Sequence, residues 1–322
     1  MARLTLIDAA KRTGNEGTIG VVESLSLMNP FFTLAPIKSI NGAMYKFQRR
    51  SALPSVGFRG YNEGVASTKS VIQDVIVECK NMLGVSEVDK ALADLSKEGV
   101  QMFRSKEDSA YLAAMGQTFA SKAYYGSSAT TAADIDGVGT VLGTLGGTCI
   151  SATGNTASVQ TSMYFWSFTD AVGSKAGRLP GVEIPVANGS LPSAMDLGVQ
   201  MVLDSGGSNK FPAYTTIFEF HPGLAIYDTR SVGRLANIQA AATAAPPTVA
   251  LINQVITAMM PYTCDLITCN KATYNSIQGL KGTTFTQTAP YESADIFKRA
   301  AYFNGIPILV DENITSTEAV VS

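Results

Sequence analysis

Two arms of alternating apolar and polar residues, joined by a glycine-rich centre, occupy residues 45–80 and constrain the fold more than any other stretch. The apolar positions are Tyr45, Phe47, Leu53, Val56 and Phe58 in the first arm and Val71, Ile72, Val75, Ile76 and Val77 in the second. This alternation predicts two strands of one long, projecting β-hairpin, with residues 60–64 at the connection.

A hairpin of this length needs another surface to lie on, because an isolated two-stranded ribbon is marginally stable in water. A neighbouring subunit is the natural candidate for that surface. The alternative is that both arms are ordinary strands within the sheet of the chain's own domain.

The charged residues of this hairpin carry both signs, since basic residues are interleaved with Glu63, Asp74 and Glu78. Mixed signs suit contacts between identical subunits better than contacts with nucleic acid, because such charges set register and orientation. We therefore predict inter-subunit contacts at a set of five charged residues: Arg49, Arg50, Arg59, Glu63 and Lys69. The alternative is that these side chains are simply exposed to solvent.

The charge balance and the apolar stretches argue against several classes of protein. A formal net charge of -2 disfavours a dedicated nucleic-acid binder, which would carry a strongly basic face. The longest apolar stretches are shorter than the ~20 residues of a membrane span, and the N-terminus lacks the pattern of a secretory signal. We expect a soluble protein of the cytoplasm that does not contact a membrane.

No group of residues has the spacing of a catalytic, cofactor or metal site. His221 is the single histidine, so we expect it to have a structural role at a strand end. The glycines of residues 137–147 lack the Gly-Lys-Ser/Thr ending of a phosphate-binding loop. The stretch from Asp134 to Gly137 resembles the start of a calcium loop but lacks the remaining ligands. We therefore predict no enzymatic activity, no cofactor and no metal ion.

Downstream of the hairpin, the sequence indicates a mixture of helices and strands. Ser86 and Asp89 resemble a capping box and predict a helix that ends at Gly99, and the longest helix follows at about residues 105–125. The Gly/Thr-rich residues 127–147 predict a loop. Segments typical of strands follow this loop, namely residues 161–168, 197–203, 214–220 and, as a strand or a strand with a short helix, 224–238.

A linker of small residues, 240–247, marks the best internal boundary, and the residues beyond it predict a compact α/β lobe. This lobe contains a helix at 249–259 that ends at Pro261, a strand at 265–268, a helix at 271–280 and a strand at 302–310. The tail, residues 319–322, is short enough to add one more strand. At the other end of the chain, residues 1–41 are interpreted as an extended arm with a short helix at 4–11.

Several short motifs, taken in their order along the chain, resemble those of one known family. They are residues 53–59 (LPSVGFR), 62–65 (NEGV), 105–108 (SKED), 124–129 (YYGSSA), 213–218 (AYTTIF), 228–230 (DTR), 234–238 (RLANI) and 303–307 (FNGIP). Together they resemble the tailed-phage major capsid proteins with the Hong Kong 97-like fold, in the group found in short-tailed phages and related prophages. The runner-up is another virion structural protein, such as a tail-tube or decoration subunit, but that reading does not explain the long helix directly after the hairpin.

The resemblance implies an α+β fold with named parts. These are an N-terminal arm (1–43), an extended β-hairpin loop (44–81), a peripheral domain (82–238) with a long spine helix and a β-sheet, an axial α/β domain (239–299) and closing strands (300–322).

It also implies a function without catalysis. The chain would be a major capsid protein that self-assembles into hexamers and pentamers of an icosahedral shell around double-stranded DNA. Its other expected partners are portal and scaffolding proteins, with the packaged DNA held by non-specific contact. The expected location is the virion, after assembly in the cytoplasm of the host bacterium.

Overall fold

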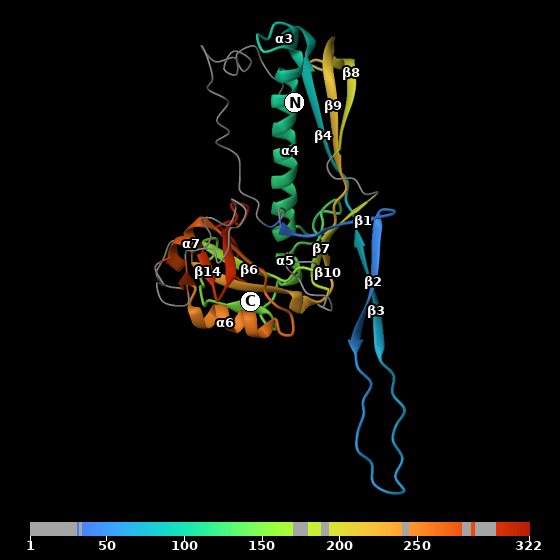
Figure 1. The fold of residues 1–322 in the computed structure, drawn as a ribbon, viewed down its shortest axis with the longest axis vertical. Helices are drawn as coiled ribbons and strands as arrows, with labels where there is room; N and C mark the ends of the chain where they lie inside the picture. Colours follow the sequence, from blue (N-terminus) through green and yellow to red (C-terminus); the bar gives the residue numbers. More distant parts are fainter. Residues whose placement is uncertain are drawn as a thin grey trace.

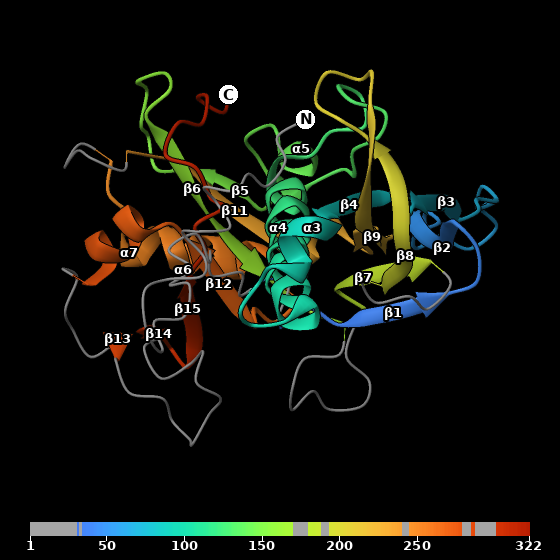
Figure 2. The ribbon, with the colours of Figure 1, turned by 90° about the horizontal axis from the view of Figure 1, so that it is seen from above.

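A 26-residue helix, α4 (Val100–Tyr125), runs along the long axis of the molecule and connects its two sheet regions (Figure 1). The computed structural model describes residues 31, 34–169, 180–187, 193–239, 245–278, 285–286 and 301–322. Viewed from above, a seven-stranded sheet lies on one side of α4 and two three-stranded sheets lie on the other (Figure 2). The helix therefore forms the common support of both regions.

The seven-stranded sheet has the strand order β13-β14-β15-β12-β6-β11-β5. Its strands are β5 (Cys149–Ser151), β6 (Gln160–Trp166), β11 (Val232–Gln239), β12 (Leu266–Cys269), β13 (Phe285–Thr286), β14 (Ala301–Phe303) and β15 (Ile306–Val310). Strands β6 and β11 are buried along their whole length, because helices cover both faces. The helices α6 (Val249–Ala258) and α7 (Lys271–Gln278) lie on one face, and the end of α4 with the short helix α5 (Val138–Val141) lies on the other.

Alternate residues of β6 supply the two cores on either side of this sheet. Tyr164 and Trp166 pack with Tyr124 of α4, whereas Phe165 packs with Val255 of α6. Because neighbouring side chains of a strand point to opposite faces, one strand supports both layers.

The first three-stranded sheet consists of β4 (Met82–Asp89), β9 (Lys210–Phe220) and β8 (Ser193–Leu203), all antiparallel. The first part of α4 packs on one face of this sheet, where the ring of Tyr111 stacks on Phe218 at 5.6 Å between centroids. Arg104 of α4 also pairs with Asp196 of β8, with Nη2 2.6 Å from Oδ1. The second sheet has the order β1 (Ile37–Ile40), β7 (Val182–Ala187) and β10 (Ala225–Ile226), and the short helix η1 (Thr229–Ser231) follows it.

Strands β2 (Met44–Ala52) and β3 (Val71–Glu78) form a separate antiparallel ribbon, and residues 53–70 continue it away from the body of the molecule (Figure 1). The predicted projecting hairpin is therefore confirmed, but its ladder is shorter than expected: Leu53, Val56 and Phe58, predicted as strand positions, lie beyond the last pair of Ala52 with Val71. The alternative, in which its arms belong to the domain's own sheet, is wrong.

Several expected elements differ from the observed ones. The helix expected from Ser86 is wrong: residues 82–89 form β4, paired along its length with β9, and the helix α3 comprises only Lys90–Asp94. Ser86 is buried there beneath α4. Pairing with β9 therefore outweighs the local capping signal, as tertiary context often does. The long helix also begins at Val100, five residues earlier than expected.

The expected boundary at residue 239 is also wrong, since it divides a single sheet. Strands β5, β6 and β11 precede it, whereas β12, β14 and β15 follow it, yet all six belong to the seven-stranded sheet. The tail does not form a ladder. Glu318 makes an isolated bridge to Gln160 instead. The helix expected at 4–11 lies outside the described residues.

Candidate inter-subunit surface

The root of the hairpin is fixed to the body by five side chains, which we call the root cluster: Lys38, Tyr45, Phe47, Glu183 and Tyr227. The hydroxyl oxygens of Tyr45 and Tyr227 lie 2.5 Å apart, and the Tyr227 hydroxyl donates a hydrogen bond to Glu183. Lys38 donates to Tyr45 over 2.7 Å, and the ring of Phe47 lies 4.5 Å from that of Tyr227.

Charges and hydrogen bonds within the root cluster stabilise the charged form of Lys38 and the neutral form of Tyr227. The hydrogen bond to Tyr45 and the charge of Glu183 raise the pKa of Lys38 against the effect of burial. Burial and the bond to Glu183 raise the pKa of Tyr227, so this hydroxyl keeps its proton. The cluster joins β1, β2, β7 and the residue after β10, and it therefore sets the direction in which the hairpin leaves the body.

The face of the ribbon opposite the root cluster, which we call the outer face, carries exposed side chains. Met44, Ile72 and Ile76 are exposed there. Among them, Lys46 and Asp74 form a cross-strand ion pair of 2.8 Å. Exposed pairs of this kind contribute little to stability, so the outer face is available for contacts.

The tip of the hairpin closes on itself in a compact turn. The amide of Gly60 donates to Oε2 of Glu63 over 3.1 Å, and Arg59 donates to the carbonyl oxygen of Glu63 over 2.8 Å. Asn62 has a φ of 66°, a conformation that asparagine tolerates better than most residues. The turn presents Phe58 and Tyr61, whose exposed fractions are 112% and 102%.

Beyond the root cluster, the hairpin displays a group of large exposed apolar residues, which we call the apolar tip set: Leu53, Val56, Phe58, Tyr61 and Val65. A soluble chain rarely exposes so many apolar side chains in one place unless they contact a partner. Leu53, Val56 and Phe58 belong to the alternating pattern seen in the sequence, whereas the contacts predicted from the sequence were charged residues. The signal that identifies them is apolar alternation at positions that no element of the chain can cover.

The five charged residues predicted as contacts are distributed over the whole hairpin. Arg49 is half-buried on the inner face, where its charge acts on Asp228. Arg59 and Glu63 form the turn at the tip. Arg50 and Lys69 are exposed. The structure therefore does not bring these five together, and their contacts with another copy stay a prediction.

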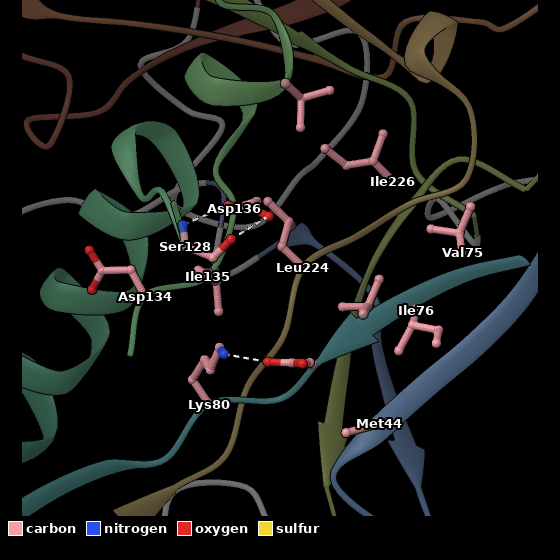
Figure 3. A pocket seen from close by; sticks show the side chains of 13 residues that line it. Met44, Val75, Ile76, Lys80, Ser128, Asp134, Ile135, Asp136, Leu224 and Ile226 are labelled. Atoms are coloured by element: carbon pink, nitrogen blue, oxygen red, sulfur yellow. Dashed lines mark hydrogen bonds and ion pairs between the residues drawn. The ribbon is translucent and has the colours of Figure 1, made fainter. Parts of the chain in front are cut away.

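A pocket of about 490 Å³ lies beside the root of the hairpin, and we call it the root pocket (Figure 3). Ile76, Ile135, Val141 and Leu224 supply apolar walls. Polar groups on its lining are engaged within the chain: Asp136 accepts from the amide and hydroxyl of Ser128, Asp134 pairs with Lys122 at 2.6 Å, and Glu78 pairs with Lys80.

Chemical sites are not evident in the described part of the chain. No three His, Cys, Asp or Glu residues gather there as metal ligands do. The two aspartates of the calcium-like motif, Asp134 and Asp136, hold Lys122 and Ser128. His221 follows β9, where its carbonyl oxygen accepts the amide of Ala187. No helix among the described residues is long and apolar enough to cross a membrane.

A long hairpin with an uncovered apolar tip, attached to a mixed α/β body, is typical of a structural subunit that contacts other molecules. The model of the family described as major capsid protein GP7 matches residues 13–322. The chain therefore belongs to this family, and it is a major capsid protein, a subunit of the shell of a bacteriophage head. The resemblance to the tailed-phage major capsid proteins is confirmed.

Solved structures show the same Hong Kong 97-like fold. A structure of bacteriophage Epsilon15 matches with a TM-score of 0.73 and 24% identity, over 100% of this chain and 98% of that one. The capsid of bacteriophage JBD30 matches with a TM-score of 0.52 and 10% identity, over 97% and 99%. No curated protein matches the chain by sequence.

Proposed function

We propose that the hairpin of each subunit binds a neighbouring copy, and that copies joined in this way form the hexamers and pentamers of an icosahedral shell around double-stranded DNA. The observation that supports this proposal is the apolar tip set, whose residues belong to the segment 53–70 that extends beyond β2 and β3, away from the body (Figure 1). The same proposal assigns the chain no catalytic role.

The energetics favour the aromatic residues of the tip as the main contacts. Fully burying one large apolar side chain contributes about 1.5–3 kcal/mol, whereas an exposed ion pair contributes about 0–1 kcal/mol. Phe58 and Tyr61 have most to gain because both are fully exposed in the single chain. The charged residues Arg50 and Lys69 would then set register and encounter rate.

The two parts of the hairpin suit a shell in which the same contact recurs in slightly different surroundings. The β2–β3 ladder and the root cluster hold its base, while residues 53–70 have no regular ladder. A contact segment without a ladder can adjust between five-fold and six-fold rings. In a closed shell built from identical chains, every hairpin can then contact a neighbouring copy.

Further partners belong to the same proposal. The net charge of -2 suits non-specific contact with packaged DNA more than tight binding. The proposal also includes portal and scaffolding proteins as partners and assembly in the bacterial cytoplasm. The N-terminal arm, residues 1–43, is proposed as a second appendage along the body or along a partner.

Replacing residues 57–68 by a Gly/Ser segment of equal length tests the proposal. We expect a folded chain with the circular dichroism and thermal unfolding of the natural one, because these residues are exposed, but no closed shells in electron micrographs. The matched control replaces residues 205–208 in the exposed turn between β8 and β9 and keeps assembly. Closed shells of normal size from the 57–68 variant would refute the hairpin's role, and rings or tubes from the natural chain would contradict an icosahedral shell.

A further inference from the structure

We propose that the hairpin tip of one copy inserts into the root pocket of the next copy. This inference rests on the proposed function, since it names the surface that receives the hairpin. The tip lies at the far end of the hairpin from the body (Figure 1), whereas the pocket is lined by residues at the root of the hairpin, among them Met44 and Glu78.

The root pocket has the chemistry of a receptor for a side chain that is apolar and cationic. Its walls include Ile76 and Val141, both exposed in the single chain. Glu78, Asp134 and Asp136 lie on its lining, where Lys80 pairs with Glu78 and Lys122 pairs with Asp134, so the charges of these five residues sum to a single negative charge. Each of these carboxylates still has lone pairs beyond those its present donors use.

The tip carries the complementary groups in a preformed shape. Phe58 and Tyr61 supply apolar surface, and between them lies Arg59. Arg59 uses one nitrogen, Nη1, to hold the carbonyl oxygen of Glu63, and a guanidinium has five N–H donors. The remaining donors are therefore free for a carboxylate. Because the turn is already closed, insertion would order few additional bonds, which lowers the entropic cost of binding.

A single chain cannot make this contact with itself. The ribbon is straight, and its tip points away from the root (Figure 1). Each copy thus carries one tip and one pocket. A contact of this kind is head-to-tail, and it closes into a ring when the rotation between copies divides a full turn. Every tip and every pocket is then occupied, as a ring of five or six copies requires.

Paired cysteines test the contact in assembled shells. Gly64→Cys places a thiol beside the tip at an open position, without altering Phe58 or Arg59. Combined with Val141→Cys at the pocket, it is expected to give disulfide-linked dimers and higher multiples on a non-reducing gel. Both single variants, which keep the chain's own cysteines, are expected to lack this ladder.

The control pairs Gly64→Cys with Met201→Cys, on the exposed surface of β8 away from the pocket. Shells that cross-link through Met201→Cys, or that show no ladder with Val141→Cys, would overturn the pocket as receptor and leave the hairpin's role intact. Closed shells made by the 57–68 replacement would instead refute the hairpin's role itself. The two failures are therefore distinguishable.

A second variant does not depend on cross-linking. Val141→Trp fills the pocket from a partly exposed position, so we expect a folded monomer, checked by thermal unfolding, that forms no shells. Normal shells from Val141→Trp would overturn the inference. A Val141→Thr control, similar in size to valine, is expected to assemble.

Discussion

The guanidinium of Arg234 and the carboxylate of Glu318 form an ion pair in the interior, with Nη2 2.9 Å from Oε2 and the side chains 6% and 5% exposed. Arg234 also donates to the hydroxyl of Ser162, and Tyr125 donates to Glu318 over 2.6 Å. One buried pair therefore joins β11, β6, the end of α4 and the segment near the C-terminus.

Glu318→Ala is expected to lower the free energy of unfolding by about 3–5 kcal/mol, because it leaves the Arg234 guanidinium buried without its counter-charge. Urea unfolding of the unassembled chain measures this change. Glu312→Ala is the matched control, since its partner Lys271 is largely exposed, and we expect that variant to unfold like the natural chain. Equal stability of all three chains would contradict the prediction.

Tyr227→Phe tests the root cluster with the loss of a single oxygen. The variant removes the donor to Glu183 and the acceptor for Tyr45, and a lost hydrogen bond of this kind costs about 1 kcal/mol. We expect faster hydrogen exchange at the amides of β2 and β3. Tyr61→Phe, at the exposed tip, serves as control and leaves exchange unchanged. Unaltered protection in Tyr227→Phe would show that the cluster does not hold the hairpin.

The hairpin and the long helix were predictable because their signals are local. Alternation of apolar residues marks β2 and β3, and the helical spacing of Tyr111, Met115 and Phe119 marks α4. The strand β4 was not predictable from local signals. Ser86 offers a local helix signal, and only pairing with β9, more than a hundred residues later, overrides it.

The sheet order and the root cluster were beyond sequence reasoning for a related reason. Strands β6 and β12 are neighbours although a hundred residues separate them. Lys38, Glu183 and Tyr227 meet only because β1, β7 and β10 form one sheet. No pattern of spacing in one sequence states which strands are neighbours, so the domain boundary and the pocket could not be placed.

Acid is expected to loosen β8 from α4. The hydrogen bond from Arg104 is the main cause of the lowered pKa of Asp196, so the folded carboxylate stays ionised at a lower pH than the unfolded one. The stabilising effect of this ion pair is complete above pH 3.8, the usual pKa of the carboxyl group, and is lost as the pH falls through the lowered pKa. Thermal unfolding between pH 6 and about pH 2 should show this slope. Asp196→Asn should flatten it, and an identical profile in both chains would exclude the pair as its source.

Gly126→Ala is expected to destabilise the fold through a steric conflict. A Cβ atom at this position would lie 2.2 Å from the carbonyl oxygen of Ile135 and 2.6 Å from that of Lys122, because the loop after α4 returns against the helix end. Displacing such backbone atoms costs about 1–3 kcal/mol or more. Gly57→Ala is the control, since nothing lies within 4 Å of its added carbon. Chemical denaturation compares the two, and equal midpoints would show that the loop shifts without cost.

Phe58→Ala and Tyr61→Ala are expected to abolish shell formation while leaving the unassembled chain as stable as the natural one. Both side chains are fully exposed, so their removal takes nothing from the folded monomer. In an assembly contact, however, a central aromatic anchor contributes about 2 kcal/mol or more.

Arg50→Ala and Lys69→Ala are the matched comparison on the same hairpin. Rim charges act mainly on encounter rate and salt dependence, so these variants should form shells more slowly and with a weaker response to added salt. Light scattering during assembly, repeated at several salt concentrations, separates the two classes. The opposite result would be loss of shells in Arg50→Ala and Lys69→Ala together with normal assembly of Phe58→Ala and Tyr61→Ala. It would show that the charged residues, and not the aromatic ones, are the main contacts.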